Sequence, residues 1–86
     1  MKNFMKTVTV YSTPTCPFCK MAKQFLKEKG VAFIDVDVAA DEKQADAMIK
    51  KSGQMGVPVI AVADESGKEE IIIGFDRAKL ATAVGL

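Results

Sequence analysis

The chain contains no histidine, no tryptophan, only two cysteines and no long hydrophobic run. A hydrolase that pairs a nucleophilic cysteine with a histidine base is disfavoured, because the imidazole is missing. A zinc site needs about four nitrogen or sulfur ligands, more than the two thiols supply. The longest apolar run, VPVIAVA at residues 57–63, is far too short to cross a bilayer. These absences leave the two thiols as the main candidates for chemistry.

An excess of charge of one sign is also missing. The 12 basic and 11 acidic side chains give a formal net charge of +1, which excludes the strongly basic footprint of a nucleic-acid-binding protein. The 86 residues predict one domain, residues 1–86. The first residues, MKNFMKTVTV, lack the apolar segment and cleavage site of a signal peptide. We therefore expect a soluble cytoplasmic protein, in which a disulfide is more often transient and catalytic than structural.

Hydrophobic periodicity predicts four strands and three helices. Alternating or β-branched segments predict strands at residues 7–12, 31–38, 57–63 and 69–73. The first helix is expected from Pro17 to a stop at Gly30. Asp41 and Asp76 are typical N-caps for the second and third helices.

The order of these elements is β-α-β-α-β-β-α. Its opening βαβ unit implies a parallel strand pair, and the short turn at residues 64–68 implies an antiparallel hairpin. The sequence thus predicts an α/β domain with a four-stranded mixed sheet flanked by three helices.

The segment PTCPFCK, residues 14–20, places both cysteines where the first strand gives way to the first helix. Cys16 is expected at the N-cap and Cys19 in the first turn, so both sulfurs lie on the same side of the helix. The unpaired amides and the helix dipole there favour a thiolate at Cys16, as does the nearby Lys20. Thiol–disulfide exchange requires such a thiolate, and C-x-x-C beside a βαβ pattern is typical of redox proteins.

Three other interpretations of the cysteine pair stay open. A structural disulfide would close so small a loop that it would restrain the unfolded chain little. A zinc or iron–sulfur site would have to be shared by two chains through Cys16. Two inert cysteines in the core are the third possibility, against which their position at a helix start argues.

Three segments carry a family resemblance: VTVYSTPTCPFCKMAKQFL (residues 8–26), GVPVI (56–60) and GFDRAKL (74–80). Through them the chain resembles, over nearly its whole length, a glutaredoxin-like member of the thioredoxin superfamily. The resemblance implies a thioredoxin-like (glutaredoxin) fold. CPFC is similar to the motif of dithiol glutaredoxins, which implies that Cys16 is the nucleophile and Cys19 the resolving thiol. The implied activity is reduction of protein or glutathione mixed disulfides through a Cys16–Cys19 redox-active disulfide.

The same resemblance implies the partners. Glutathione is a possible co-substrate, and glutathione or thioredoxin reductase is the electron donor. The two thiols, the missing histidine and Pro17 predict in addition a monomer with no bound cofactor or metal. The family usually has a lysine that contacts glutathione at the position of Thr13. It usually has a glycine at the position of Ile73 and a second acid at that of Arg77. These departures imply weaker coupling to glutathione, and a likeness to YruB-type proteins and to the redoxins that supply ribonucleotide reductase.

Substrate-binding residues are expected around the cysteines. Val57 and Pro58 resemble the family's cis-proline loop, with a trans proline that starts an edge strand as the alternative. Phe18 lines a substrate groove or belongs to the apolar stripe of its helix, and Asp76 binds the substrate's amino group or only caps the last helix. The candidate residues are Thr13, Phe18, Val57, Pro58, Gly74, Phe75 and Asp76.

Overall fold

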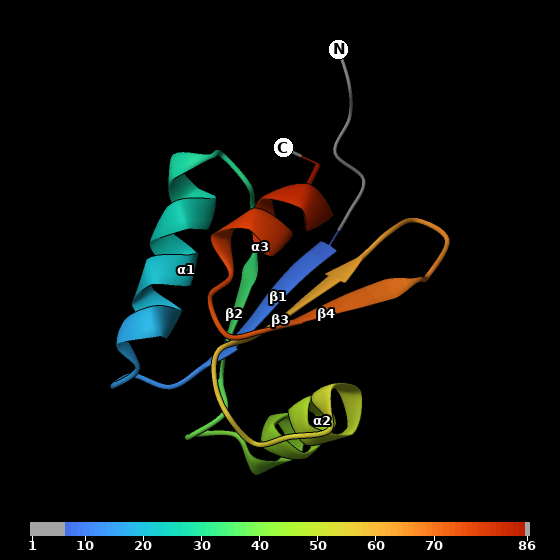
Figure 1. Ribbon diagram of the computed structural model, residues 1–86. Coiled ribbons are helices and arrows are strands. Elements are labelled where there is room, and N and C mark those ends of the chain that lie inside the picture. The colour runs from blue at the N-terminus through green and yellow to red at the C-terminus, as the bar shows by residue number, and fades with distance from the viewer. Residues whose placement is uncertain (1–6, 86) are drawn as a thin grey trace.

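One four-stranded sheet forms the middle layer of the protein (Figure 1). A computed structural model describes residues 7–85. The strands are β1 (Thr7–Ser12), β2 (Ile34–Asp37), β3 (Val59–Ala63) and β4 (Glu69–Ile73), in the spatial order β2-β1-β3-β4. β1 pairs with β2 in parallel, whereas β3 is antiparallel to both β1 and β4. The predicted mixed sheet and element order are confirmed.

Three helices cover the two faces of this sheet: α1 (Pro17–Glu28), α2 (Glu42–Ser52) and α3 (Arg77–Ala83). α1 and α3 lie on one face, and α2 lies alone on the other (Figure 1). The predicted caps are in place. Asp41 accepts hydrogen bonds from the N–H groups of Lys43 and Gln44, and Asp76 accepts one from Lys79. Among residues 7–85, none of the helices has the length and apolarity needed to span a bilayer.

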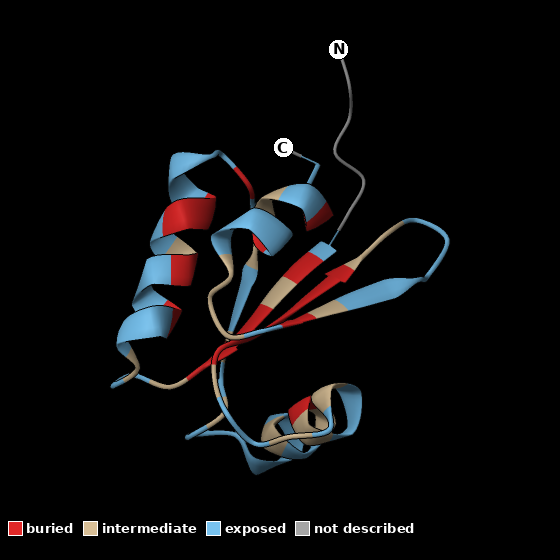
Figure 2. Ribbon diagram, viewed as in Figure 1, coloured by how far each residue is buried: buried red, intermediate tan, exposed pale blue. Residues whose placement is uncertain are grey.

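Two hydrophobic cores lie on opposite faces of the sheet, because alternate residues of a strand point to opposite sides (Figure 2). The larger core, beneath α1 and α3, contains Val8, Val10, Ala22, Phe25, Leu26, Val31, Ile60, Val62, Ile72, Leu80, Ala83 and Val84. The smaller core, beneath α2, contains Tyr11, Met48, Val59 and Ala61. The sheet is therefore buried on both faces at its centre, which fixes the position of its strand ends.

Two strands are shorter than the sequence predicts. The strand expected at residues 31–38 is paired only over Ile34–Asp37, because the N–H of Val31 closes the end of α1 by bonding to the Leu26 carbonyl at 2.9 Å. The strand expected at residues 57–63 starts at Val59. The peptide bond between Val57 and Pro58 is cis, and a proline has no N–H to give to a ladder.

The larger core yields a stability prediction. Leu26 is fully buried between α1 and the sheet, so Leu26→Ala should lower the free energy of unfolding by about 2–5 kcal/mol through lost burial and a residual cavity. Met55→Ala is the control, since Met55 is 77% exposed and should change stability by less than about 0.5 kcal/mol. Urea unfolding of the reduced proteins measures both values. Equal stabilities of the two variants would contradict the assignment of Leu26 to the core.

Candidate active site

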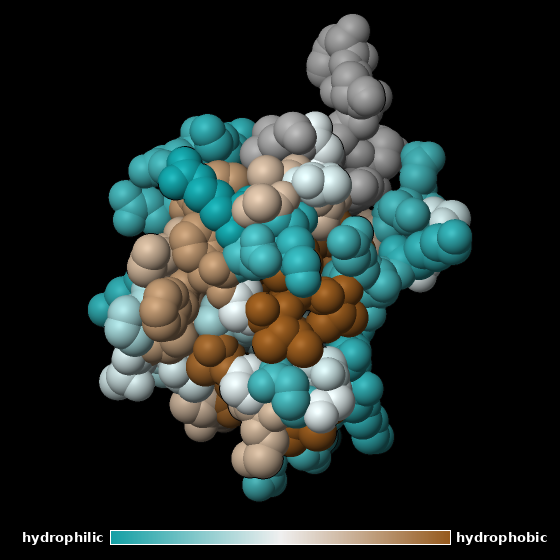
Figure 3. All heavy atoms as spheres, viewed as in Figure 1, coloured by the Kyte–Doolittle hydropathy of each residue, from teal (hydrophilic) through white to brown (hydrophobic). Residues whose placement is uncertain are grey.

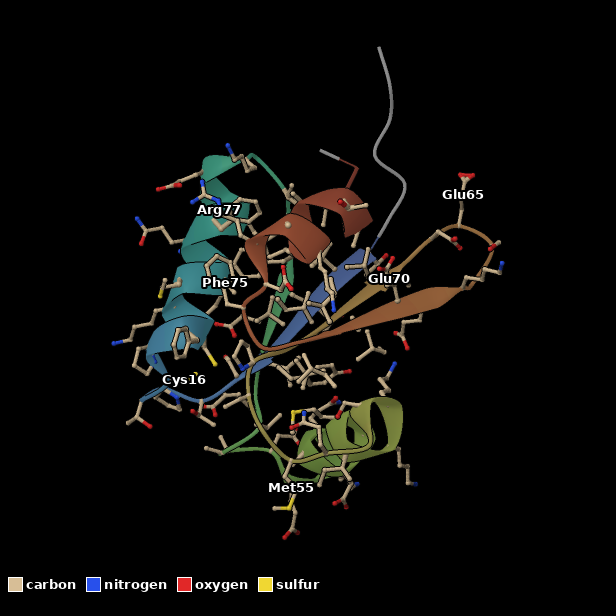
Figure 4. The ribbon with its side chains drawn as sticks, viewed as in Figure 1. Cys16, Met55, Glu65, Glu70, Phe75 and Arg77 are labelled. Carbon is tan, nitrogen blue, oxygen red and sulfur yellow. The ribbon has the colours of Figure 1, made fainter. Side chains whose placement is uncertain are left out.

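The two cysteines lie at the junction of β1 and α1. β1 ends at Ser12, and the N–H of Cys16 bonds to the Thr13 carbonyl at 3.4 Å to close the connecting turn. Cys16 is the N-cap of α1, and Pro17 is its first residue, where a missing N–H is not needed. Cys16 therefore stands at the exposed end of α1, at the edge of the sheet (Figure 4).

The half-buried sulfur of Cys16 lies between two backbone groups. It accepts the N–H of Cys19 at 3.2 Å, and its S–H is directed at the Val57 carbonyl at 3.8 Å. Because the Cys19 amide belongs to the first turn of α1, its N–H has no carbonyl partner within the helix. An N–H aimed at sulfur stabilises negative charge there, so the position suits a thiolate.

Cys19 has the opposite environment. Its side chain is 0% exposed, and burial, followed by the hydrogen bond to Cys16, raises the pKa of the Cys19 thiol to about 11. A backbone hydrogen bond from Thr13 and the charge of Lys23 oppose that rise. Both cysteines are free thiols in the structure. At neutral pH, Cys19 is therefore a protonated thiol directly behind Cys16.

The cis-proline loop connects Cys16 with the loop before α3. The Val57 carbonyl faces Cys16, and the Pro58 carbonyl accepts the N–H of Gly74 at 2.8 Å. Gly74 has a φ of 78°, a left-handed conformation that a side chain disfavours. The chain thus brings together Cys16, Val57, Pro58 and Gly74, which are distant in the sequence.

Phe75 and Asp76 are placed differently from these residues. Phe75 packs edge-on against Phe25 of α1, with the ring centroids 6.1 Å apart and the planes at 60°. Asp76 caps α3, as one of its two predicted roles requires, and remains partly exposed. Thr13 is half-buried, and its backbone carbonyl accepts the N–H of Cys16. The binding role of each of these three residues stays a prediction.

The expectation that Phe18 packs in the core is wrong. The buried stripe of α1 runs through Cys19, Ala22, Phe25 and Leu26. Phe18 and Met21 lie beside that stripe and are 58% and 47% exposed. Figure 3 shows apolar side chains gathered over α1 and β4 on this face. Phe18 therefore remains available to a substrate.

A polar cluster near Cys19 was missed by the sequence analysis. The ammonium group of Lys23 lies 3.1 Å from the Asp35 carboxylate and 3.4 Å from the Ser12 hydroxyl. The Ser12 hydroxyl in turn donates to Asp35 at 3.0 Å. Lys23 comes one helical turn after Cys19, which is the available signal, but its pairing depends on how α1 packs beside β2.

The metal-binding alternative gains no support from a single chain. Across residues 7–85, no group of three or more histidine, cysteine, aspartate or glutamate side chains is arranged to hold a metal ion. A shared site would need ligands from a second chain.

Comparisons with known proteins agree with this geometry. The glutaredoxin family model matches residues 8–66. An uncharacterized glutaredoxin-like 8.6 kDa protein in the rubredoxin operon of Clostridium pasteurianum is 45% identical over 73 residues, which are 85% of this chain and 91% of that protein. The N-acetyl-S-hydroxy-L-cysteine reductase of Bacillus subtilis is 34% identical over 77 residues, covering 88% of this chain and 83% of that one.

A solved structure gives the same result for the fold. The crystal structure of a glutaredoxin from Archaeoglobus fulgidus superposes with a TM-score of 0.79 at 26% identity, covering 92% of this chain and 86% of that chain. The family match, the relatives and the shared fold agree with the C-x-x-C pair at the start of α1. The chain belongs to the glutaredoxin family of thiol–disulfide oxidoreductases.

Proposed function

We propose that this protein reduces disulfides of other proteins, and glutathione mixed disulfides more slowly, through a Cys16–Cys19 dithiol/disulfide cycle. The observation that carries the proposal is the asymmetry of the two thiols. Cys16 is half-buried with an amide hydrogen bond on its sulfur, whereas Cys19 is fully buried with a raised pKa. One sulfur is placed to attack a substrate, and the other is shielded until the first has reacted.

The cycle has two exchange steps. The Cys16 thiolate attacks one sulfur of the substrate disulfide, which forms a mixed disulfide and releases the other sulfur as a thiolate. Cys19 then loses its proton to the released thiolate or to water and attacks Cys16 Sγ. The second substrate sulfur leaves as a thiolate and is protonated. Two electrons pass to the substrate, and the Cys16–Cys19 disulfide remains.

The order of the two steps follows from the causes of the raised Cys19 pKa. Two of those causes, the hydrogen bond to Cys16 and the negative charge of Cys16, disappear once Cys16 is in a mixed disulfide. Burial remains, and the Thr13 backbone and Lys23 then favour the thiolate of Cys19. Cys19 therefore ionises more easily after Cys16 has reacted than before.

The cis-proline loop provides a place for the substrate backbone. The Val57 carbonyl lies 3.8 Å from Cys16 Sγ, so a chain that binds along Val57 carries its own sulfur close to the nucleophile. Binding of this kind resembles the addition of a strand to a sheet. Exposed Phe18 adds an apolar contact beside Cys16.

A sulfenic acid is a second substrate class. The Bacillus subtilis relative is by its name a reductase of an S-hydroxycysteine derivative. Attack of Cys16 on a sulfenyl sulfur would release hydroxide and form the same mixed disulfide, which Cys19 resolves in the same way. Both substrates thus use one site and one intermediate.

We also retain a monomeric, cytoplasmic protein as our expectation.

The assignment of the nucleophile predicts selective alkylation. At neutral pH, iodoacetamide should modify Cys16 in the reduced protein and leave Cys19 free, since Cys19 is buried and protonated. In Cys16→Ser, alkylation of Cys19 at neutral pH should remain slow, because burial, the largest cause of the raised Cys19 pKa, is unchanged by the substitution. Mass spectrometry of digested protein measures both sites. Equal modification of the two cysteines at pH 7 would refute the assignment.

The cycle itself is tested with Cys19→Ser. Without a resolving thiol, this variant should accumulate a mixed disulfide between Cys16 and one cysteine of a disulfide-containing protein substrate, visible on a gel as a band that a reductant removes. Cys16→Ser is the matched control and should form no such band. A stable adduct formed by Cys16→Ser, or none by Cys19→Ser, would overturn the proposed cycle.

The donor is tested with Thr13→Lys. Thr13 stands where the family's lysine contacts glutathione, so restoring the lysine should raise turnover with glutathione by up to about fivefold, which corresponds to about 1 kcal/mol for an exposed ion pair. Turnover with thioredoxin reductase should stay unchanged. High salt should reduce the gain, because the added contact is between exposed charges. If Thr13→Lys leaves glutathione-dependent turnover unaltered, this departure from the family pattern has no effect on the choice of donor.

A further inference from the structure

A groove lies between α1 and α3 and leads from the start of α1, where the cysteines are, toward its C-terminal end. Its larger part is a pocket of ≈ 470 Å³ lined by Phe25, Lys29, Arg77, Ala78 and Ala81. A smaller part of ≈ 170 Å³, nearer the start of α1, shares Phe25 and Arg77 with it and is also lined by Met21, Gln24, Glu28 and Phe75. The shared residues make the two parts one continuous surface.

The end of the groove that Met21 lines is the end nearer to the cysteine pair. Phe18 and Met21 occur three positions apart on α1, so both exposed side chains lie on one side of the helix. Phe75 follows Gly74, whose N–H is bonded to Pro58 of the cis-proline loop. Figure 4 shows Cys16, Phe75 and Arg77 in succession along α1. A chain bound at Cys16 can therefore continue into the groove.

The far end of the groove carries two cations on an apolar floor. The Arg77 guanidinium lies 5.3 Å and the Lys29 ammonium 5.8 Å from the centroid of the Phe25 ring. Within residues 7–85, neither cation forms an ion pair, whereas Lys23 and Lys51 each have an acidic partner. The Phe25 ring holds both charges in place by cation–π attraction. Two positioned cations without an acidic partner suit a carboxylate.

Among the groove residues within 7–85, Glu28 alone carries a carboxylate. It lines the smaller part and accepts a hydrogen bond from Gln24 at 3.2 Å, rather than pairing with Arg77. Its charge repels an incoming anion, so it weakens the site without occupying it.

We propose that this groove binds an acidic residue of the protein whose disulfide Cys16 attacks. The inference rests on the proposed function and names its substrate class: a polypeptide with apolar residues next to its cysteine and a carboxylate further along. Along the axis of α1, Phe25 and Lys29 lie about 13 and 20 Å beyond Cys16. An extended peptide spans that distance in about four to six residues.

The test uses short peptides that each contain one cysteine in a mixed disulfide with thionitrobenzoate. A glutamate lies about five residues before or after the cysteine, and a matched peptide carries glutamine there; all ends are capped to remove their charges. Attack of Cys16 on the peptide sulfur displaces coloured thionitrobenzoate, and Cys19 then frees the peptide thiol. In one orientation at least, the second-order rate constant of the reduced protein should favour glutamate by about threefold to tenfold in low salt, and less in high salt.

Paired variants locate the effect. The double variant Lys29→Gln/Arg77→Gln should bring the preference to about one, because the rate on the glutamate peptide falls more than the rate on the glutamine peptide. The control Lys50→Gln/Lys79→Gln removes the same charge from exposed positions outside the groove and should retain the preference. Glu28→Gln should increase it, because a repelling charge is lost.

Three outcomes would overturn the inference. The first is no preference for glutamate in the unmodified protein, and the second is a preference that survives in Lys29→Gln/Arg77→Gln. The third is that this variant loses rate on a glutathione mixed disulfide of a small thiol by the same factor as on the glutamate peptide. The last result would assign the two cations to a glutathione carboxylate. The rate on the glutamine peptide reports the proposed function separately: if it is absent, the cycle fails, and if it is present without a preference, only the groove assignment fails.

Discussion

The hydrogen bond from the Cys19 N–H to Cys16 Sγ is the contact on which the chemistry of this protein depends. It makes one sulfur the cap of α1 and thereby separates two otherwise similar thiols. Cys16 remains at the surface, where the helix end and the Val57 carbonyl meet, while Cys19 turns into the core. Since a first-turn amide has no carbonyl partner within the helix, using it to bind sulfur costs the helix nothing.

The core beneath α1 holds this arrangement in place. Ala22, Phe25 and Leu26 fix the rotation of α1 on the sheet, and the direction of the first turn follows from that rotation. On the other side of the cysteines, the hydrogen bond from the Gly74 N–H to the Pro58 carbonyl joins the cis-proline loop to the loop before α3. Three segments distant in the sequence are therefore linked in turn, Cys16 to Val57 and Pro58 to Gly74, and their relative positions are set by the sheet between the two cores.

Sequence reasoning recovered most of the fold for identifiable reasons. The strands at residues 7–12 and 69–73 and the caps Asp41 and Asp76 depend on local alternation and local hydrogen bonds, and each is as predicted. The predicted strand limits near Val31 and Pro58 were wrong. The Val31 N–H bonds to the Leu26 carbonyl at the end of α1, and Pro58 has no N–H to give to a ladder. Spacing left two roles open for Phe18, a substrate groove or the apolar stripe, and the structure leaves it exposed at the margin of that stripe.

The sequence by itself determined the order of elements, the placing of both thiols at a helix start and, through the family resemblance, the redox chemistry. Those properties depend on residues within a turn or two of one another, so local pattern contains them. Only the tertiary structure decided which face of α1 meets β2 and which meets α3. That packing pairs Lys23 with Asp35 and places Arg77 beside Lys29 on the ring of Phe25. No local pattern encodes such pairs, because each partner is positioned by a different element and the contact exists only once both elements are packed on the sheet.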